Sequence, residues 1–418
     1  MDAGLVRGTL AIAICQVMLT GCQSPIPFHA APDPDAPVLG FGGSAPYVSL
    51  GPPSPPAAWP PAAEPRPGPP SIASRTAGRS PDVYAYTRRG MLSPAVRGIP
   101  GRVYVANSDG STIDVINPRT YRVIGHVRVG AQPHYVIPSW DLRTLWVNDS
   151  GGDDLVPIDP RTGRRGPAVP VTAPYNLQFT PNGRYALVMV NRPARIDVRD
   201  PRSMRLRRSI PLPCGIAHAD FSADGSYLVA GCAATGYVIR VDLRRGKVTR
   251  AVRLGRRAMP QDVKIAPDGT LFYVADMANG GVWTIDAVRF RPMGFVRTGR
   301  GAHGLIPSRD ATVLYVTNRA EGTISLLDFA TRQVVGRWRL PGGGSPDMGG
   351  VSADGRVLWL SGRRQGVVYA ISTRSGRLGR GPVVRAGELI RAIRVGRSPH
   401  GVCVFPQPGR HSLGHTYR

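Results

Sequence analysis

Lysine is almost absent from this 418-residue sequence: Lys247 and Lys264 are the only two, although Lys and Arg together number 53. Acidic residues are also few, 27 in all, so the formal net charge is +26. Such a charge favours attraction to polyanions such as nucleic acid, anionic lipid headgroups or acidic envelope polymers. Aromatic residues make up only 7% and are not interleaved with the arginines, so we expect no specific binding of nucleic acid.

Several motifs that carry chemistry are missing as well. The sequence has no Gly-x-Ser-x-Gly elbow, phosphate-binding loop, paired-cysteine zinc motif or Cys-x-x-Cys-His haem attachment. Beyond the N-terminus, no apolar run is long enough to cross a membrane. These absences exclude the common signatures of serine hydrolases, nucleotide-binding proteins, zinc ribbons and c-type haem proteins.

The N-terminus resembles the signal of bacterial lipoproteins. Arg7 precedes an apolar stretch at residues 10–19, which ends in Leu19-Thr20-Gly21-Cys22 and so resembles a lipobox. The resemblance implies that residues 1–21 are a signal peptide and that Cys22 carries a diacylglycerol and palmitate. We therefore expect an extracytoplasmic protein that is lipid-anchored to the bacterial cell membrane.

Glycine and proline are abundant, 51 and 42 residues, which disfavours a helical protein and favours short strands joined by turns. Seventeen of the prolines lie in residues 23–82, which lack periodic apolar positions. We predict a lipid-anchored, Pro-rich disordered linker at residues 22–94. A folded domain at residues 95–409 and a C-terminal tail at residues 410–418 complete the expected organisation.

The domain is built from an internal repeat. Turn dipeptides such as Asp224-Gly225 and Asp268-Gly269 each follow a short β-rich run and precede an apolar tetrad. The segment before each turn recurs at intervals of 41 to 53 residues, beginning near His134, Tyr175, Ala217, Gln261, His303, Asp347 and His400. Four strands per repeat are typical of a β-propeller blade. The sequence therefore predicts an all-β fold, a seven-bladed β-propeller, in which residues 399–405 pair with residues 101–105 to close the ring. The long last interval indicates an insertion near residues 381–391.

These repeats resemble the YVTN β-propeller family, a WD40-like repeat fold. Tyr315-Val316-Thr317-Asn318 is the signature itself, and looser copies are Tyr104-Val105-Ala106-Asn107, Trp146-Val147-Asn148-Asp149 and Tyr273-Val274-Ala275-Asp276. The resemblance covers about residues 100–408 and implies the fold rather than one activity. Members of this family look like extracytoplasmic binding or scaffold proteins, so the resemblance implies such a role here. Related propellers include lactonases, lyases and dehydrogenase subunits.

Blade geometry assigns the connections to two faces. The first-to-second and third-to-fourth turns, such as residues 180–185 and 200–205, lie on one side, here named the turn face. The second-to-third loops, such as residues 149–154, and the blade-to-blade connections lie on the other, the loop face. The turn face is rich in arginine and could bind an anionic envelope polymer or lipid headgroups, or could simply be a solvated surface. The anion-binding candidates are Arg119, Arg164, Arg165, Arg207, Arg208, Arg244, Arg245 and Arg374.

The blade-opening residues converge on the central channel at the loop face. His303, Asp347, His400 and His134 come from four consecutive blades once the ring is closed. Imidazoles with a carboxylate could bind zinc, copper or iron, or ligate a cofactor, at the channel mouth. The alternatives are acid–base catalysis and a structural role, in which each His bonds to backbone across a turn.

Three cysteines remain after Cys15 in the signal and Cys22. Cys214 and Cys232 flank a predicted hairpin at nearly matching positions, which predicts a disulfide between them. Cys403, in the closing strand, is expected to be a buried apolar residue.

Taken together, the sequence favours a lipid-anchored binding or scaffold propeller that presents its channel face to a ligand or protein partner. The alternative is a metal- or cofactor-dependent extracytoplasmic enzyme or redox protein that uses the His-rich channel mouth.

Overall fold

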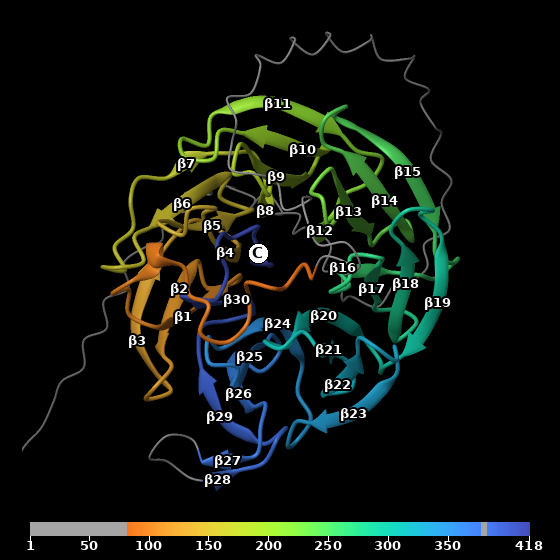
Figure 1. Cartoon of the computed structure of the whole chain (residues 1–418). Coiled ribbons are helices and arrows are strands. Elements are labelled where there is room, and N and C mark those ends of the chain that lie inside the picture. The colour runs from red at the N-terminus through yellow and green to blue at the C-terminus, as the bar shows by residue number, and fades with distance from the viewer. Residues whose placement is uncertain (1–81, 378–382) are drawn as a thin grey trace, which may run out of the picture. The chain divides into compact units, whose positions relative to one another are not determined.

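The computed structural model describes residues 82–377 and 383–418, and it is a β-propeller. Seven four-stranded antiparallel sheets are arranged as blades around a central channel (Figure 1). The predicted all-β, seven-bladed fold is confirmed.

Each blade runs from an inner strand at the channel to an outer strand at the rim. Blade 1 holds β1 (Arg102–Asn107), β2 (Thr112–Asn117), β3 (Arg122–Arg128) and, as its inner strand, β30 (Pro399–Phe405). Blade 2 holds β4 (Pro133–Pro138), β5 (Leu145–Asp149), β6 (Asp154–Ile158) and β7 (Val169–Pro170), and blade 3 holds β8 (Pro174–Phe179), β9 (Ala186–Asn191), β10 (Ala194–Arg199) and β11 (Leu206–Pro211). Blade 4 holds β12 (Ala219–Phe221), β13 (Tyr227–Cys232), β14 (Tyr237–Asp242) and β15 (Lys247–Arg253), and blade 5 holds β16 (Pro260–Ile265), β17 (Leu271–Asp276), β18 (Gly281–Asp286) and β19 (Pro292–Arg297). Blade 6 holds β20 (Ala302–Pro307), β21 (Val313–Asn318), β22 (Thr323–Asp328) and β23 (Val334–Arg339), and blade 7 holds β24 (Pro346–Val351), β25 (Val357–Gly362), β26 (Val367–Ser372) and β29 (Leu389–Arg394).

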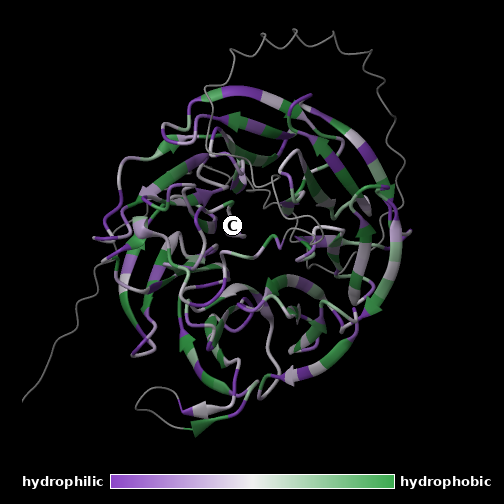
Figure 2. Ribbon diagram, viewed as in Figure 1, coloured by the Kyte–Doolittle hydropathy of each residue, from purple (hydrophilic) through white to green (hydrophobic). Residues whose placement is uncertain are grey.

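The core lies between neighbouring blades. Second strands such as β13 and β17 are buried along their whole length, because each is covered on both faces by the adjoining sheets. Outer strands such as β3 and β23 alternate between exposed and half-buried residues, as a strand with one solvated side does. Figure 2 shows the same alternation of hydrophilic and hydrophobic residues along the rim strands.

The ring closes as the repeat pattern predicts. β30 pairs antiparallel with β1, with Val103 opposite Val404 and Arg102 opposite Phe405. This pairing gives blade 1 its fourth strand from the far end of the sequence and removes two open sheet edges.

Two blades differ from the regular repeat. β7 is only two residues long, and it pairs with β6, which contains Pro157 and so lacks one backbone donor. In blade 7 a hairpin of β27 (Gly376–Arg377) and β28 (Val383–Val384) is inserted between β26 and β29. The insertion thus begins before the predicted residues 381–391.

The propeller also takes up residues assigned from the sequence to a linker and a tail. A 3₁₀ helix, η1 (Pro94–Val96), precedes β1. Further upstream, Val83 donates a backbone hydrogen bond to Pro267, and the Tyr84 hydroxyl donates to the Ile265 carbonyl. Both partners lie at the turn-face end of β16, so the described part of the linker packs on that face.

Residues 410–418 enter the centre of the ring, where the C label stands in Figure 1. Leu413 is buried, and its carbonyl accepts a hydrogen bond from Phe179 N–H. Arg418 donates to the carbonyls of Phe221 and Ser222. The segment expected to be a tail therefore plugs the channel at the turn face.

Among the described residues, no helix is long and apolar enough to cross a membrane. The predicted signal peptide and lipidated Cys22 lie outside the described residues.

Candidate functional site

The second residue of the inner strand occupies an equivalent place in most blades. His303 is second in β20, Asp347 in β24 and His400 in β30, each directly after the first residue of its strand. The three side chains are almost completely buried, with 3%, 0% and 2% of their surface exposed. The repeat therefore delivers two imidazoles and a carboxylate to one level of the channel, near the loop face.

Asp347 is the centre of this group, which we name the channel triad (His303, Asp347 and His400). Its Oδ1 lies 2.8 Å from Nδ1 of His303, and its Oδ2 lies 3.7 Å from Nε2 of His400. One potential ligand atom from each residue can be chosen so that all three lie within 4.8 Å of one another.

The channel triad holds polar atoms that have no hydrogen bond. These are both carboxylate oxygens of Asp347, Nδ1 of His303 and Nδ1 of His400. The short His303–Asp347 contact thus brings a ring nitrogen and a carboxylate oxygen together without the directional geometry of a hydrogen bond. Unpaired polar atoms in a buried site cost free energy, so a native protein usually supplies them with a partner.

The surroundings of the channel triad favour an ionised Asp347 and a neutral His400. Burial alone would raise the pKa of Asp347, but Arg319, His303 and His400 together hold it well below its usual range. Burial lowers the pKa of His400 well below the ordinary histidine value. An ionised carboxylate and neutral imidazoles are the forms that coordinate a metal ion.

His134, the fourth predicted ligand, lies beside the channel triad but outside it. Its ring centre is 5.0 Å from that of His400 and 4.4 Å from that of Tyr175. Its Nδ1 lies 3.3 Å from Oγ of Ser150, and burial lowers its pKa to about 4. His134 is also more exposed than the channel triad, so it forms part of the wall at the channel mouth.

Repeat alignment misses Arg319, which follows β21 on the loop face. Its guanidinium lies 3.5 Å from Oδ2 of Asp347 and is 7% exposed. No signal in the sequence singles it out, because it stands in a second-to-third loop that the aligned positions do not include.

A second group of ionisable residues lies deeper in the channel. The Tyr135 hydroxyl is 3.1 Å from Nε2 of His218, whose Nδ1 is 3.8 Å from Oδ1 of Asp262. The same oxygen of Asp262 is 3.7 Å from Nζ of Lys264. His218 stands one residue out of register with the aligned positions, and its pKa is lowered to about 4 by burial.

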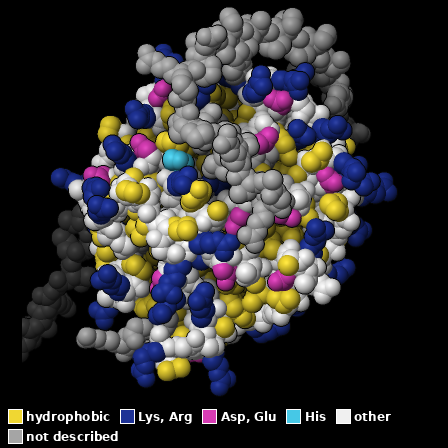
Figure 3. All heavy atoms as spheres, in the orientation of Figure 1, with side chains coloured by type: hydrophobic (Ala, Val, Ile, Leu, Met, Phe, Trp, Pro, Cys, Tyr) yellow, Lys and Arg dark blue, Asp and Glu magenta, His cyan; other side chains and the backbone are white. Residues whose placement is uncertain are grey.

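The predicted anion-binding arginines are distributed over turns and outer strands, and several have partners. Arg207 pairs with Asp200 at 3.0 Å and Arg245 with Asp242 at 3.3 Å. Others contact acidic groups or carbonyls: Arg165 donates to the Arg128 carbonyl, Arg208 to the Leu243 carbonyl, and Arg374 lies 4.0 Å from Asp310. Figure 3 shows Lys and Arg spread over the visible face and its rim, with Asp and Glu between them. Anion binding by this set stays a prediction.

The described residues include three cysteines, two in a disulfide and one free. Cys214 and Cys232 form a disulfide with a Cα–Cα distance of 5.8 Å, which joins the loop before β12 to the end of β13. Cys403 is a buried free thiol, and burial raises its pKa.

Comparisons with known proteins agree with this architecture. A search of curated proteins finds no match. The chain is similar in fold to a solved structure of hydrazine synthase from Kuenenia stuttgartiensis, with 19% identity and a TM-score of 0.58 over 72% of this chain and 99% of that chain. It is also similar to the periplasmic gluconolactonase PpgL of Pseudomonas aeruginosa, with 19% identity and a TM-score of 0.60 over 74% and 99%. The dihydro-heme d1 dehydrogenase NirN, solved in complex with DHE, matches with 15% identity and a TM-score of 0.56 over 78% of each chain.

A family model gives a more specific assignment than these structures. The model for the YNCE-like beta-propeller matches residues 78–410, which covers every blade and the described end of the linker. The chain belongs to the YNCE-like β-propeller family.

Proposed function

We propose that this protein is a lipid-anchored, extracytoplasmic binding protein that holds one divalent transition-metal ion in its channel. His303, Asp347 and His400 are the ligands, and the open coordination positions face the channel mouth, where a ligand or partner binds. The observation that carries the proposal is the buried channel triad, whose four nitrogen and oxygen atoms named above have no hydrogen-bond partner.

Coordination distances support this assignment. Zinc binds nitrogen at about 2.0–2.1 Å and carboxylate oxygen at about 2.0–2.2 Å, so two ligands of one ion are at most roughly 4 Å apart. The channel triad, with ligand atoms within 4.8 Å, needs only a sub-ångström contraction to enclose an ion. Arg319 contacts Oδ2 of Asp347, which leaves Oδ1 as the oxygen for the metal.

Two imidazoles and one carboxylate suit zinc, iron or copper better than magnesium or calcium, which prefer all-oxygen sites. Three protein ligands leave at least one position open, as in metal sites that bind an exchangeable ligand. His134 and Tyr175 stand beside the channel triad and would contact whatever occupies that position.

The test is elemental analysis of the full chain after equilibration with Zn²⁺ and removal of the free ion. We expect one equivalent of zinc per chain, which the His303→Gln/His400→Gln double variant loses. The matched control is His134→Gln, which removes a neighbouring imidazole outside the channel triad and should keep the ion. Absence of stoichiometric metal in the wild type, or its retention in a folded double variant, would overturn the proposal.

A further inference from the structure

Lys264 lies in the interior of the channel, in an environment unusual for lysine. Its side chain is only 3% exposed, and its Nζ has no hydrogen-bond partner. The nearest carboxylate, Oδ1 of Asp262, is 3.7 Å away, which is beyond hydrogen-bond distance. An ammonium group carries three donors, so this one has unused donors in a site that largely excludes water.

Asp262 does not need the lysine as a partner. Its Oδ1 accepts a hydrogen bond from Val263 N–H at 2.9 Å, and its Oδ2 accepts one from Leu305 N–H at 3.0 Å. The carboxylate thus ties β16 to β20 and is stabilised by backbone donors. The donors of Lys264 remain available to an acceptor from outside the chain.

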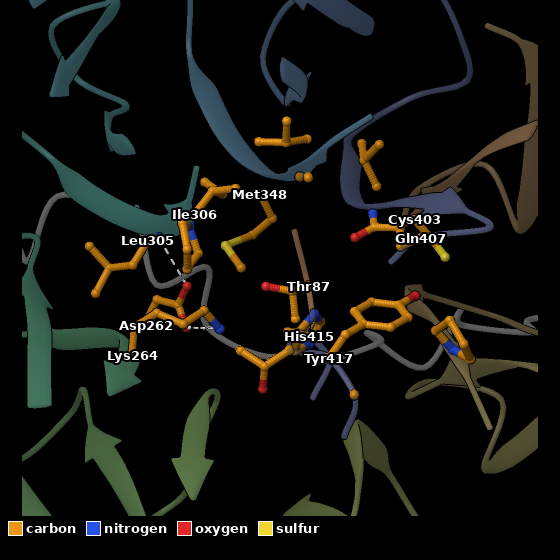
Figure 4. A pocket seen from close by; sticks show the side chains of 18 of the residues that line it. Thr87, Asp262, Lys264, Leu305, Ile306, Met348, Cys403, Gln407, His415 and Tyr417 are labelled. Atoms are coloured by element: carbon orange, nitrogen blue, oxygen red, sulfur yellow. Dashed lines mark hydrogen bonds and ion pairs between the residues drawn. The ribbon is translucent and has the colours of Figure 1, made fainter. Parts of the chain in front are cut away.

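A cavity of about 70 Å³ adjoins this ammonium group. Figure 4 shows that the side chains of Lys264 and Met348 both point into it, with His415 and Tyr417 of the C-terminal segment forming another side. Ile306 adds an apolar wall next to Met348. The cavity therefore has one cationic end and one apolar side.

We propose that this cavity binds a short-chain monocarboxylate, with its carboxylate on Lys264 and its alkyl part against Met348 and Ile306. A carboxylate accepts the free ammonium donors, and charge-assisted hydrogen bonds of this kind are the strong ones in a buried site. Two or three carbons of alkyl chain suit a cavity of this size, and a bare inorganic anion would leave the apolar wall without a partner. The site is separate from the channel triad and does not depend on metal.

The scarcity of lysine makes a direct test feasible. Full-length protein that carries ¹³C at the lysine ε position has only two lysine signals, from Lys247 and Lys264, and the Lys247→Met variant assigns them. Titration with sodium propionate should shift the Lys264 signal to saturation and leave the Lys247 signal in place. Sodium chloride at equal ionic strength and 1-propanol are the matched controls, and neither should produce the saturating shift.

A calorimetric titration with propionate provides the second readout. Lys264→Met, which keeps the volume and removes the charge, should weaken binding at least tenfold, whereas Lys247→Met should not change it. Zinc binding should persist in Lys264→Met, so failure here is distinguishable from failure of the metal proposal. No shift of the Lys264 signal, an equal shift with chloride, or undiminished binding in Lys264→Met would overturn the inference.

Discussion

At the scale of single residues, two carboxylates meet on the loop face away from the channel triad. Asp149 and Asp154 are directly opposite each other where β5 pairs with β6, and Gly130 N–H donates to Oδ2 of Asp149 at 2.8 Å. Burial, followed by the hydrogen bond and the charge of Asp154, raises the pKa of Asp149 to about 8. The pair therefore holds one proton at neutral pH.

This shift predicts a pH-dependent stability. Between about pH 4, where an unfolded Asp ionises, and pH 8, the folded protein binds the extra proton and the unfolded chain does not. The free energy of unfolding should therefore fall as pH rises through this window, by up to about 1.4 kcal/mol per pH unit. Asp149→Asn imitates the protonated acid and should remove that fall, which urea unfolding at pH 5 and pH 8 would measure.

The control for this experiment is Asp153→Asn on the same loop. Asp153 is exposed, and its Oδ1 accepts a hydrogen bond from Ala173 N–H, which an asparagine oxygen can also accept. This variant should keep the pH dependence of the wild type. An Asp149→Asn protein with an unchanged pH profile would show that the pair does not retain its proton.

The residues of the candidate site were predictable only where the repeat determines them. Aligning the blades places His303, Asp347 and His400 at one level of the channel, because equivalent strand positions face the same way. The same alignment does not predict that His134 turns towards Ser150 and Tyr175, since side-chain rotation depends on local neighbours. Arg319 could not be predicted, because its contact crosses from a loop of blade 6 to blade 7.

At the scale of elements, the segment of residues 410–418 lies at the centre of the ring and contacts three neighbouring blades. Trp140 of blade 2 stacks on His411 with ring centres 3.9 Å apart, and Asn176 of blade 3 lies 2.9 Å from Nε2 of His415. In blade 4, Asp220 accepts a hydrogen bond from Thr416. The sequence of this segment has no periodic apolar pattern, so its buried position follows from long-range contacts that a local pattern cannot reveal.

The anchoring of this segment can be measured at Leu413. Its side chain is 1% exposed and packs in the core between blades 3 and 4. Leu413→Ala should lower the free energy of unfolding by about 2–4 kcal/mol, because it leaves a cavity in a packed core. Leu206→Ala, on outer strand β11 with 47% exposure, should change it by no more than about 0.5 kcal/mol. Equal effects of the two substitutions in denaturant unfolding would mean that the segment is not docked in solution.

At the scale of the whole molecule, turn dipeptides and a regular interval were sufficient to predict seven blades and the closing strand. Two irregular features could not be predicted from the repeat. β7 has only two residues, and the linker end near Tyr84 is packed on the turn face. Composition gives the net charge of +26 but does not show where on the surface the charged side chains lie. In the structure the arginines extend over turns and outer strands, where partners such as Asp200 and Asp242 offset part of the charge.

The proposed attachment of the whole molecule to a membrane depends on Cys22. Cys22→Ser should remove the thiol that accepts the lipid, so that the protein leaves the membrane fraction and no longer incorporates labelled palmitate. Cys15→Ser, within the predicted signal peptide, should leave both properties unchanged. Cell fractionation with immunoblotting measures the result, and a Cys22→Ser protein that remains in the membrane fraction would contradict lipid anchoring.

The plug formed by residues 410–418 fills the turn-face end of the central channel. Residues 410–418 contact blades 2, 3 and 4 there, through His411, His415 and Thr416. Residue 82, where the described chain begins, leaves from the plugged side, beside Pro267. The described chain therefore enters the propeller on the turn face, at the opposite end of the channel from His303, Asp347 and His400.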